Sequence, residues 1–281
     1  MVSTDLTPPV LSGPQFEAIR RLIHEVCGIN LQAGKEALVR SRLSKRLRAL
    51  GLADFDAYLA RVREDRTGAE LSELVNALTT NKTSFFREPE HFEYLREVIV
   101  PELEGRRGPI RVWSAGCSSG EEAYSLAIVL REALTDAAWR EVRILATDIS
   151  TRVLAKARDG VYAEGEVRVI PRAWLARYFE KVQRDGQTAY AVRAELKSAV
   201  RVARLNLMEP WPMKGPFDLI VCRNVMIYFD RPTQQRLVQR FWEMLAPGGH
   251  LFVGHSESLT SLGHSFRYVR PATYVKPRRD R

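Results

Sequence analysis

The sequence contains little cysteine and no long apolar run. Its three cysteines, Cys27, Cys117 and Cys222, are spaced neither as a Cys-X-X-Cys metal pair nor as a small disulfide framework. This scarcity favours free thiols in a reducing compartment. No stretch approaches the roughly 18 apolar residues of a membrane helix, and the N-terminus lacks the basic and apolar regions of a signal peptide. The sequence therefore predicts a cytoplasmic protein without a membrane span.

Signals for a metal site or a nucleophilic cysteine are also missing. No common ligand spacing relates the histidines, so we predict structural or surface roles for all of them and no bound metal. They are His24, His91, His250, His255 and His264. Cys222 follows Val221 inside an apolar run and lacks the preceding proline of nucleic-acid methyltransferase nucleophiles, so we predict a buried, inert side chain.

The net charge is strongly positive. With a formal charge of +9 and a pI near 9.7, the chain suits a partner that carries negative charge. Nucleic acid, an anionic membrane and an acidic protein surface all meet that description, and charge alone does not choose among them. The composition, 45% hydrophobic and 27% charged, indicates a folded protein with a substantial core.

The first part of the chain predicts a small all-α domain. Pro8-Pro9 and Gly13-Pro14 indicate a flexible lead-in over residues 1–13, and apolar stripes at helical spacing continue over residues 14–80. The second helix of this domain has six basic residues against the single acid Glu36: Lys35, Arg40, Arg42, Lys45, Arg46 and Arg48. With its leucine stripe turned inward, Lys45 and Arg48 face solvent and Arg42 lies on the flank. A solvated face and a docking surface for an acidic partner are about equally supported.

The remainder alternates strands and helices in the order of a doubly wound sheet. Five apolar strands and an antiparallel hairpin are predicted at residues 110–113, 142–146, 200–205, 217–222, 250–254, 266–270 and 273–275. Ser150 is placed to cap a helix over 151–158, and Pro247-Gly248-Gly249 ends a helix over 233–245. About fifty residues precede the strand at 200, which exceeds a usual connection and indicates an inserted antiparallel β-subdomain at about 160–198. Ligands of such sheets bind at the carboxyl ends of the strands.

The turn Ser114-Ala-Gly-Cys-Ser-Ser-Gly-Glu-Glu follows the first strand and opens a helix. Its small residues permit close approach of a ligand to the backbone, but the turn is not a Gly-X-Gly-X-X-Gly sequence. Acids at Glu121 and Glu122 would repel a pyrophosphate, which favours a positively charged cofactor without phosphate, S-adenosylmethionine. Asp148, at the end of the second strand, is placed to bind ribose hydroxyls.

Six blocks, in this order, carry a family resemblance: NKTSFFREPEHF, RVWSAGCSSGEEAYS, ATDIS, NLMEP, FDLIVCRNVMIYFD and LAPGGHLFVGHSES. Together they resemble the chemotaxis receptor glutamate O-methyltransferases, the CheR family, from about residue 14 to 277. The resemblance implies a class I methyltransferase-like doubly wound α/β sheet with a C-terminal antiparallel hairpin, an N-terminal all-α domain and a small inserted antiparallel β-subdomain. Residues 14–80 would dock the substrate, 81–103 would form an interdomain segment and helix, and 104–281 would bind S-adenosylmethionine.

The same resemblance implies roles for individual residues. The cofactor contacts would be Asn81, Thr83, Arg87, Glu122, Asp148, Asn206, Leu207, Arg223 and Asn224. Arg87 and Tyr228 would lie nearest the transferred methyl group and act in catalysis. Arg42, Lys45, Arg46 and Arg48 would bind the substrate.

The implied reaction is methyl esterification of glutamate side chains on a methyl-accepting chemotaxis receptor, with S-adenosylhomocysteine as the second product. The partner would be the acidic helical bundle of that receptor. We expect a monomer that meets the membrane only through the receptor and binds no nucleic acid. Two alternatives are a class I methyltransferase acting on nucleic acid or a small molecule, and a non-catalytic module that senses S-adenosylmethionine. The segment CRNVMIYF has neither the amine site nor the Pro-Cys nucleophile of nucleic-acid enzymes.

Overall fold

The computed structural model describes residues 9–106 and 108–278, and the chain forms two compact units. The helical unit comprises the described residues up to Thr80 together with Tyr228–Asp230, and the α/β unit comprises the rest, from Asn81 onward. Most of the predicted lead-in, residues 1–13, lies outside the described residues. Among those that are described, no helix is long and apolar enough to cross a membrane.

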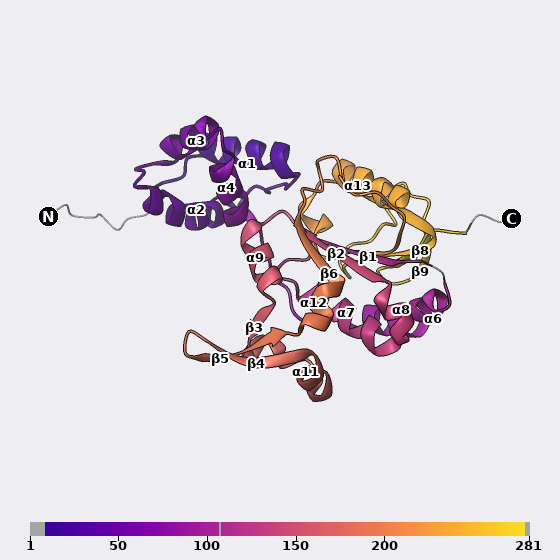
Figure 1. Cartoon of the computed structure of the whole chain (residues 1–281). Helices are drawn as coiled ribbons and strands as arrows, with labels where there is room; N and C mark the ends of the chain where they lie inside the picture. The colour runs from indigo at the N-terminus through magenta and orange to yellow at the C-terminus, as the bar shows by residue number, and fades with distance from the viewer. Residues whose placement is uncertain (1–8, 107, 279–281) are drawn as a thin grey trace. The chain divides into compact units, whose positions relative to one another are not determined.

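Four helices build the helical unit: α1 (Gly13–Cys27), α2 (Glu36–Leu50), α3 (Phe55–Glu64) and α4 (Ala69–Leu78), in indigo and violet in Figure 1. Their apolar stripes meet in a core that includes Phe16, Ile19 and Leu43. Ser12 and Gln15 form a capping box at the start of α1. A distant segment completes the unit, because Phe229 forms a β-bridge with Ile29.

A seven-stranded sheet organises the α/β unit. Its strands are β1 (Ile110–Ala115), β2 (Val142–Asp148), β6 (Val200–Arg204), β7 (Phe217–Cys222), β8 (Leu245–Val253), β9 (Arg267–Arg270) and β10 (Thr273–Val275), in the order β6-β2-β1-β7-β8-β10-β9. The first five in this order are parallel, and β10 is antiparallel to both β8 and β9. The order reverses between β1 and β7, whose carboxyl ends are therefore the expected ligand edge. The predicted doubly wound sheet with its antiparallel hairpin is confirmed.

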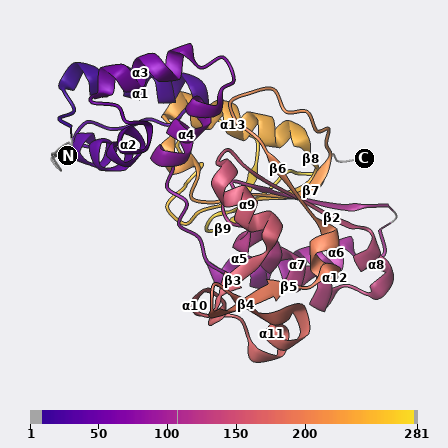
Figure 2. The same ribbon diagram turned by 60° about the vertical axis from the view of Figure 1, so that its left-hand side comes forward.

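Helices cover both faces of this sheet. α13 (Arg231–Met244) lies on one face, whereas α7 (Glu121–Ala133) and α12 (Ala194–Ala199) lie on the other (Figures 1 and 2). Because both faces are covered, all six residues of β7 are buried, which matches its nearly continuous apolar sequence. On the α13 face, the fully buried Trp113 packs edge-to-face against Trp211 with ring centroids 4.8 Å apart.

The inserted subdomain is a three-stranded antiparallel sheet. Its order is β3-β5-β4, from β3 (Val161–Ala163), β4 (Phe179–Arg184) and β5 (Gln187–Val192), with the short helices α10 (Glu164–Val167) and α11 (Arg172–Tyr178). Asp185 and Gly186 both have positive φ, 51° and 74°, as a two-residue hairpin turn of the favoured twist requires. The predicted β-subdomain is confirmed, although β3, only three residues long, was not predicted.

The helix expected within residues 81–103 contains an irregularity. It consists of α5 (Pro89–Tyr94), a π-helical turn (Leu95–Ile99) and α6 (Val100–Leu103). Pro101 has no N–H group, and its ring would clash with a carbonyl one turn earlier, so a widened turn allows the helix to continue. α8 (Asp136–Arg140) and α9 (Thr151–Asp159) complete the elements of this unit.

Two local predictions are wrong. Pro247, Gly248 and Gly249 do not separate α13 from the next strand, since α13 ends at Met244 and β8 already begins at Leu245. The chain after β10 pairs with these residues, because the Gly248 N–H donates to the Lys276 carbonyl at 2.7 Å and the Lys276 N–H donates to the Gly249 carbonyl at 2.9 Å. Ser150 precedes α9 but makes no side-chain cap.

Candidate active site

The turn after β1 is tightly packed and requires glycine. Gly116 has a φ of 94°, and a Cβ there would lie 2.4 Å from Cγ2 of Val225, in the loop that follows β7. The N–H groups of Gly116 and Cys117 both donate to the Thr147 carbonyl at 2.8 Å. The carboxyl ends of β1, β2 and β7 are thereby held together at one edge of the sheet.

Asp148 lies at that edge, at the end of β2. Its Oδ2 accepts a hydrogen bond from the Ser118 N–H and its Oδ1 accepts one from the Ser150 N–H, both at 2.9 Å. Burial raises the pKa of this carboxyl group, and the two N–H donors oppose that rise. The Ser118 hydroxyl donates to the Asn81 carbonyl at 2.9 Å, which places Asn81 beside the same turn.

A buried arginine connects three of the predicted cofactor residues. The Arg223 side chain is 2% exposed, and its Nε donates to Oε2 of Glu122, in the first turn of α7, at 2.8 Å. Its Nη1 donates to the Arg87 carbonyl at 2.5 Å. The other Glu122 oxygen accepts from the Ser114 hydroxyl at 2.6 Å. Strands β1 and β7, helix α7 and the segment before α5 are thus joined through one guanidinium group.

Both acids at the start of α7 have partners within the protein. The sequence-based argument that Glu121 and Glu122 would repel a pyrophosphate assumed two uncompensated charges, and that assumption is wrong. Glu122 is paired with Arg223, and Glu121 accepts from the Ser119 hydroxyl at 2.7 Å and lies 4.0 Å from the Lys156 ammonium group. Burial raises the pKa of Glu121. The helix start therefore presents much less negative charge than its sequence indicates, so its acids do not by themselves discriminate against a phosphate-bearing ligand.

Glu88, His91 and His255 are the one cluster among the described residues with metal-ligand chemistry, since their ligand atoms lie within 4.8 Å of one another. Arg223 already supplies a cation there, with Nη1 3.5 Å from Oε2 of Glu88 and 3.3 Å from Nδ1 of His91. Burial, with help from Arg223, lowers the pKa of His91 to about 3. A metal ion would meet a buried guanidinium at this position, so the cluster fits a hydrogen-bonded network better than a metal site. This cluster was not predicted, because His255 is distant in sequence from Glu88 and His91.

Asn206 and Leu207, two further predicted cofactor residues, follow β6 beside the end of β2. Leu205 donates its N–H to the Asp148 carbonyl at 3.0 Å, which places Asn206 just beyond the edge of β2. The Asn206 side chain shapes its own turn by accepting from the Met208 N–H at 3.0 Å. Leu207 is buried, and Thr83 is partly exposed.

The two predicted catalytic residues, Arg87 and Tyr228, lie in different units of the chain. Arg87 is partly exposed, and its Nη1 donates to the Lys82 carbonyl at 3.0 Å. Tyr228 belongs to the helical unit, where its carbonyl accepts from the Asn30 N–H at 2.8 Å.

The four predicted substrate-binding bases of α2 fall into two pairs. Lys45 and Arg48 are exposed. Arg46 instead makes a two-pronged ion pair with Glu70 of α4 at 2.8 and 2.5 Å. Arg42 donates to the Leu78 and Thr79 carbonyls at 2.7 and 3.2 Å, at the end of α4. The latter two side chains hold α2 against α4.

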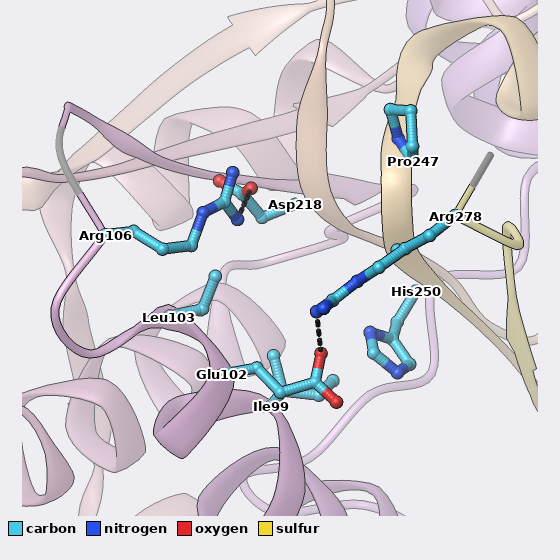
Figure 3. Close-up of a pocket in the computed structure, with 9 residues that line it drawn as sticks. Ile99, Glu102, Leu103, Arg106, Asp218, Pro247, His250 and Arg278 are labelled. Atoms are coloured by element: carbon cyan, nitrogen blue, oxygen red, sulfur yellow. Dashed lines mark hydrogen bonds and ion pairs between the residues drawn. The ribbon is translucent and has the colours of Figure 1, made fainter. Parts of the chain in front are cut away.

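A cavity of about 310 Å³ lies elsewhere in the α/β unit (Figure 3). Asp218, near the start of β7, is one of its lining residues, so the cavity lies toward the amino ends of the strands. Its charged groups are paired, Arg106 with Asp218 at 2.5 Å and Arg278 with Glu102 at 3.3 Å. The remaining lining residues are Ile99, Leu103, Pro247, Gly248 and His250. This cavity is distinct from the edge that carries Asp148 and Arg223.

A parallel sheet with a glycine turn after β1, an acid after β2 and an antiparallel hairpin at its edge defines a class I methyltransferase fold. Comparison with known families then gives the particular one. The chain belongs to the CheR family: residues 14–79 match the model described as "CheR methyltransferase, all-alpha domain" and residues 81–275 match "CheR methyltransferase, SAM binding domain".

Named relatives agree with this assignment. A chemotaxis protein methyltransferase of Klebsiella aerogenes is 44% identical, over 94% of this chain and 89% of its own length. That of Escherichia coli is 43% identical, over 94% and 91%, and a probable one from Rhizobium etli is 42% identical, over 90% and 96%. The predicted family is confirmed, and the protein is an S-adenosylmethionine-dependent chemotaxis protein methyltransferase.

Proposed function

We propose that this enzyme methylates specific glutamate side chains on the cytoplasmic domain of methyl-accepting chemotaxis receptors, in sensory adaptation. Family membership supports the class of reaction, and the single structural observation that carries the proposal is the Arg223 network. It fixes the backbone of Arg87 beside the residue that follows β7, at the carboxyl edge of the sheet, where ligands of doubly wound folds bind. Arg87 is the group that we assign to the incoming carboxylate.

The residues at this edge fit S-adenosylmethionine. Asp148 accepts from the Ser118 N–H at Oδ2 and from the Ser150 N–H at Oδ1, and because a carboxylate offers about four lone-pair sites, acceptor capacity remains for ribose hydroxyls. The close contact of Val225 with Gly116 leaves no room for a larger residue in the turn, as expected of a cradle formed by backbone. Asn81, Thr83, Arg87, Glu122, Arg223 and Asn224 would hold the remainder of the cofactor, and Asn206 and Leu207 would flank adenine.

The bound cofactor supplies a methyl group on a positively charged sulfur. A glutamate carboxylate, with an ordinary pKa of about 4.3, is ionised at neutral pH, so the protein needs no general base. One oxygen–carbon bond forms while one sulfur–carbon bond breaks, giving a methyl ester and S-adenosylhomocysteine without proton transfer. The Arg87 guanidinium would orient the carboxylate and the Tyr228 hydroxyl would donate a hydrogen bond, so that catalysis arises mainly from alignment and partial desolvation.

The partner that we propose is the acidic helical bundle of the receptor, docked on α2. Lys45 and Arg48, which are exposed, would make the main electrostatic contacts. Arg42 and Arg46 would contribute chiefly by holding α2 in place, since their guanidinium groups are engaged with α4. We further propose a cytoplasmic monomer that reaches the membrane only through the receptor and uses neither nucleic acid nor a metal.

One labelling experiment tests this function against its alternatives. The protein is incubated with methyl-labelled S-adenosylmethionine and with receptor-containing membranes, RNA or neither. Alkali-labile label on the receptor is the expected result, because carboxyl methyl esters hydrolyse in base. Stable label on RNA would indicate a nucleic-acid enzyme, and binding of S-adenosylhomocysteine without any labelling would indicate a sensor. Arg87→Ala and Tyr228→Phe should each lower turnover, and their assignments are wrong if neither does.

A further inference from the structure

Glu257 is a buried acid to which no role has yet been assigned. It follows β8 and is 6% exposed. Its Oε2 accepts from the N–H groups of Gly254 and Asn224 at 2.6 and 2.7 Å, and its Oε1 accepts from the Ile227 N–H at 3.1 Å. All three donors are backbone groups, and two of them belong to the loop that follows β7.

That loop carries residues of the candidate site and includes one residue in the left-handed region. Asn224 has a φ of 58°, a conformation that asparagine adopts more readily than most residues other than glycine. Its Nδ2 donates to Oε1 of Glu88 at 3.3 Å. Arg223 precedes it, and the chain continues through the short 3-10 helix Met226–Tyr228. Glu257 therefore holds the backbone between the cofactor residues and the predicted catalytic tyrosine.

Gly254, Asn224 and Glu257 are closely packed against one another. A Cβ on Gly254 would lie 2.6 Å from Nδ2 of Asn224 and 2.8 Å from Oε2 of Glu257. Gly254 has an ordinary φ, so glycine is required there for space rather than for backbone conformation. The end of β8, the carboxylate and the β7 loop thus form one packed assembly.

We propose that Glu257 is a positioning residue for methyl transfer, which fixes the Asn224–Ile227 loop so that Asn224 and Tyr228 adopt their working geometry. The inference rests on the proposed function, because it takes those two roles from it. A carboxylate suits this position since it only accepts hydrogen bonds and faces three N–H donors. Glutamine would turn a donor toward one of them, and aspartate would keep the acceptors but shorten the reach.

The test compares Glu257→Gln and Glu257→Asp with Glu243→Gln, which removes an exposed carboxylate from α13. Receptor methylation gives kcat and KM, calorimetry gives S-adenosylhomocysteine affinity, and hydrogen exchange reports on the peptide that covers residues 223–228. We expect Glu257→Gln to lower kcat by about 10- to 100-fold, the range for a misplaced catalytic group. KM for the receptor should stay unchanged and cofactor affinity should fall by a smaller factor, with aspartate intermediate.

Hydrogen exchange separates this inference from the proposed function. Exchange in residues 223–228 should accelerate in Glu257→Gln but not in α13 or in the Glu243→Gln control. If the wild-type protein fails to methylate receptors, the proposed function fails, whereas faster exchange would still support a role for Glu257 in fixing the loop. Unchanged exchange in that peptide would overturn the inference. So would a kcat within twofold of wild type, or a loss of activity no larger than the loss of folded protein.

Discussion

Arg223 and Glu122 illustrate how strongly single side chains are constrained at this site. Both are almost fully buried, at 2% and 9% side-chain exposure, and they form an ion pair. A buried ion pair of this kind adds little net stability, but removal of one partner leaves a buried charge without compensation. The pair therefore acts mainly to fix the geometry of the four segments that it joins.

This argument predicts an asymmetric mutational result. Arg223→Met should lower the free energy of unfolding by about 3–5 kcal/mol, because Glu122 is left charged and buried. The double variant Glu122→Gln/Arg223→Met should recover most of that loss in urea unfolding while methyl transfer remains defective. A double variant no more stable than Arg223→Met would show that the pair does not control stability at this position.

His91 should make stability depend on pH. Burial and Arg223 lower its pKa in the folded protein to about 3, whereas an unfolded histidine titrates near 6.5. As pH falls, His91 is protonated in the unfolded state before it is protonated in the folded state. Its contribution to the free energy of unfolding is therefore complete above pH 6.5 and is lost as pH falls toward 3. Between pH 7.5 and pH 5 the wild type should lose about 2 kcal/mol more than His91→Gln. Parallel stability profiles for the two proteins would contradict this.

At the scale of elements, α2 presents a testable charged surface. The double variant Lys45→Glu/Arg48→Glu reverses two exposed charges and leaves the Arg46–Glu70 pair intact. We expect a higher KM for the receptor and a weaker dependence of methylation on salt, because electrostatic attraction to an acidic surface is screened by ions. S-adenosylhomocysteine affinity should not change. Arg63→Glu, an exposed charge reversal on α3, is the control, and an equal effect there would point to net charge alone.

The sequence predicts those elements that have strong local signals. β7 was predicted with the same bounds as observed, because a buried parallel strand is a continuous apolar run. β3 and the π-helical turn were missed. The first is a short strand defined by its pairing with β5, and the second is an adjustment to Pro101. Gly248 and Gly249 were predicted to form a turn, but they lie inside β8 because their backbone groups pair with Lys276.

In the candidate site, too, features with a local sequence signal were predicted and contacts between distant segments were not. Asp148 and the turn after β1 could be placed from the sequence, because strand ends and small residues are local features. The pairing of Glu122 with Arg223 and the engagement of Arg42 and Arg46 with α4 could not. Glu257 was missed for the same reason, since its three hydrogen bonds depend on the meeting of two distant strand ends.

At the scale of the whole molecule, the two units share more than one covalent connection. The chain leaves the helical unit after Thr80, returns to it at Tyr228–Asp230 and leaves again at Arg231. Phe229 contributes a β-bridge to Ile29 and is buried. Unfolding of the α/β unit would release this short segment and remove part of the helical unit's own structure. The two units should therefore unfold together.

The distribution of tryptophan makes this coupling measurable. All five tryptophans lie in the α/β unit, at positions 113, 139, 174, 211 and 242, so their fluorescence reports on that unit, whereas far-ultraviolet circular dichroism reports on both. We expect one transition with the same midpoint by both probes. S-adenosylhomocysteine at a hundredfold excess over its Kd adds about 2.7 kcal/mol to the folded state and should raise both midpoints equally. In Asp148→Asn the same ligand concentration should produce a smaller shift. Separate midpoints, with only the fluorescence transition responding to ligand, would show that the helical unit unfolds independently despite the segment that it borrows.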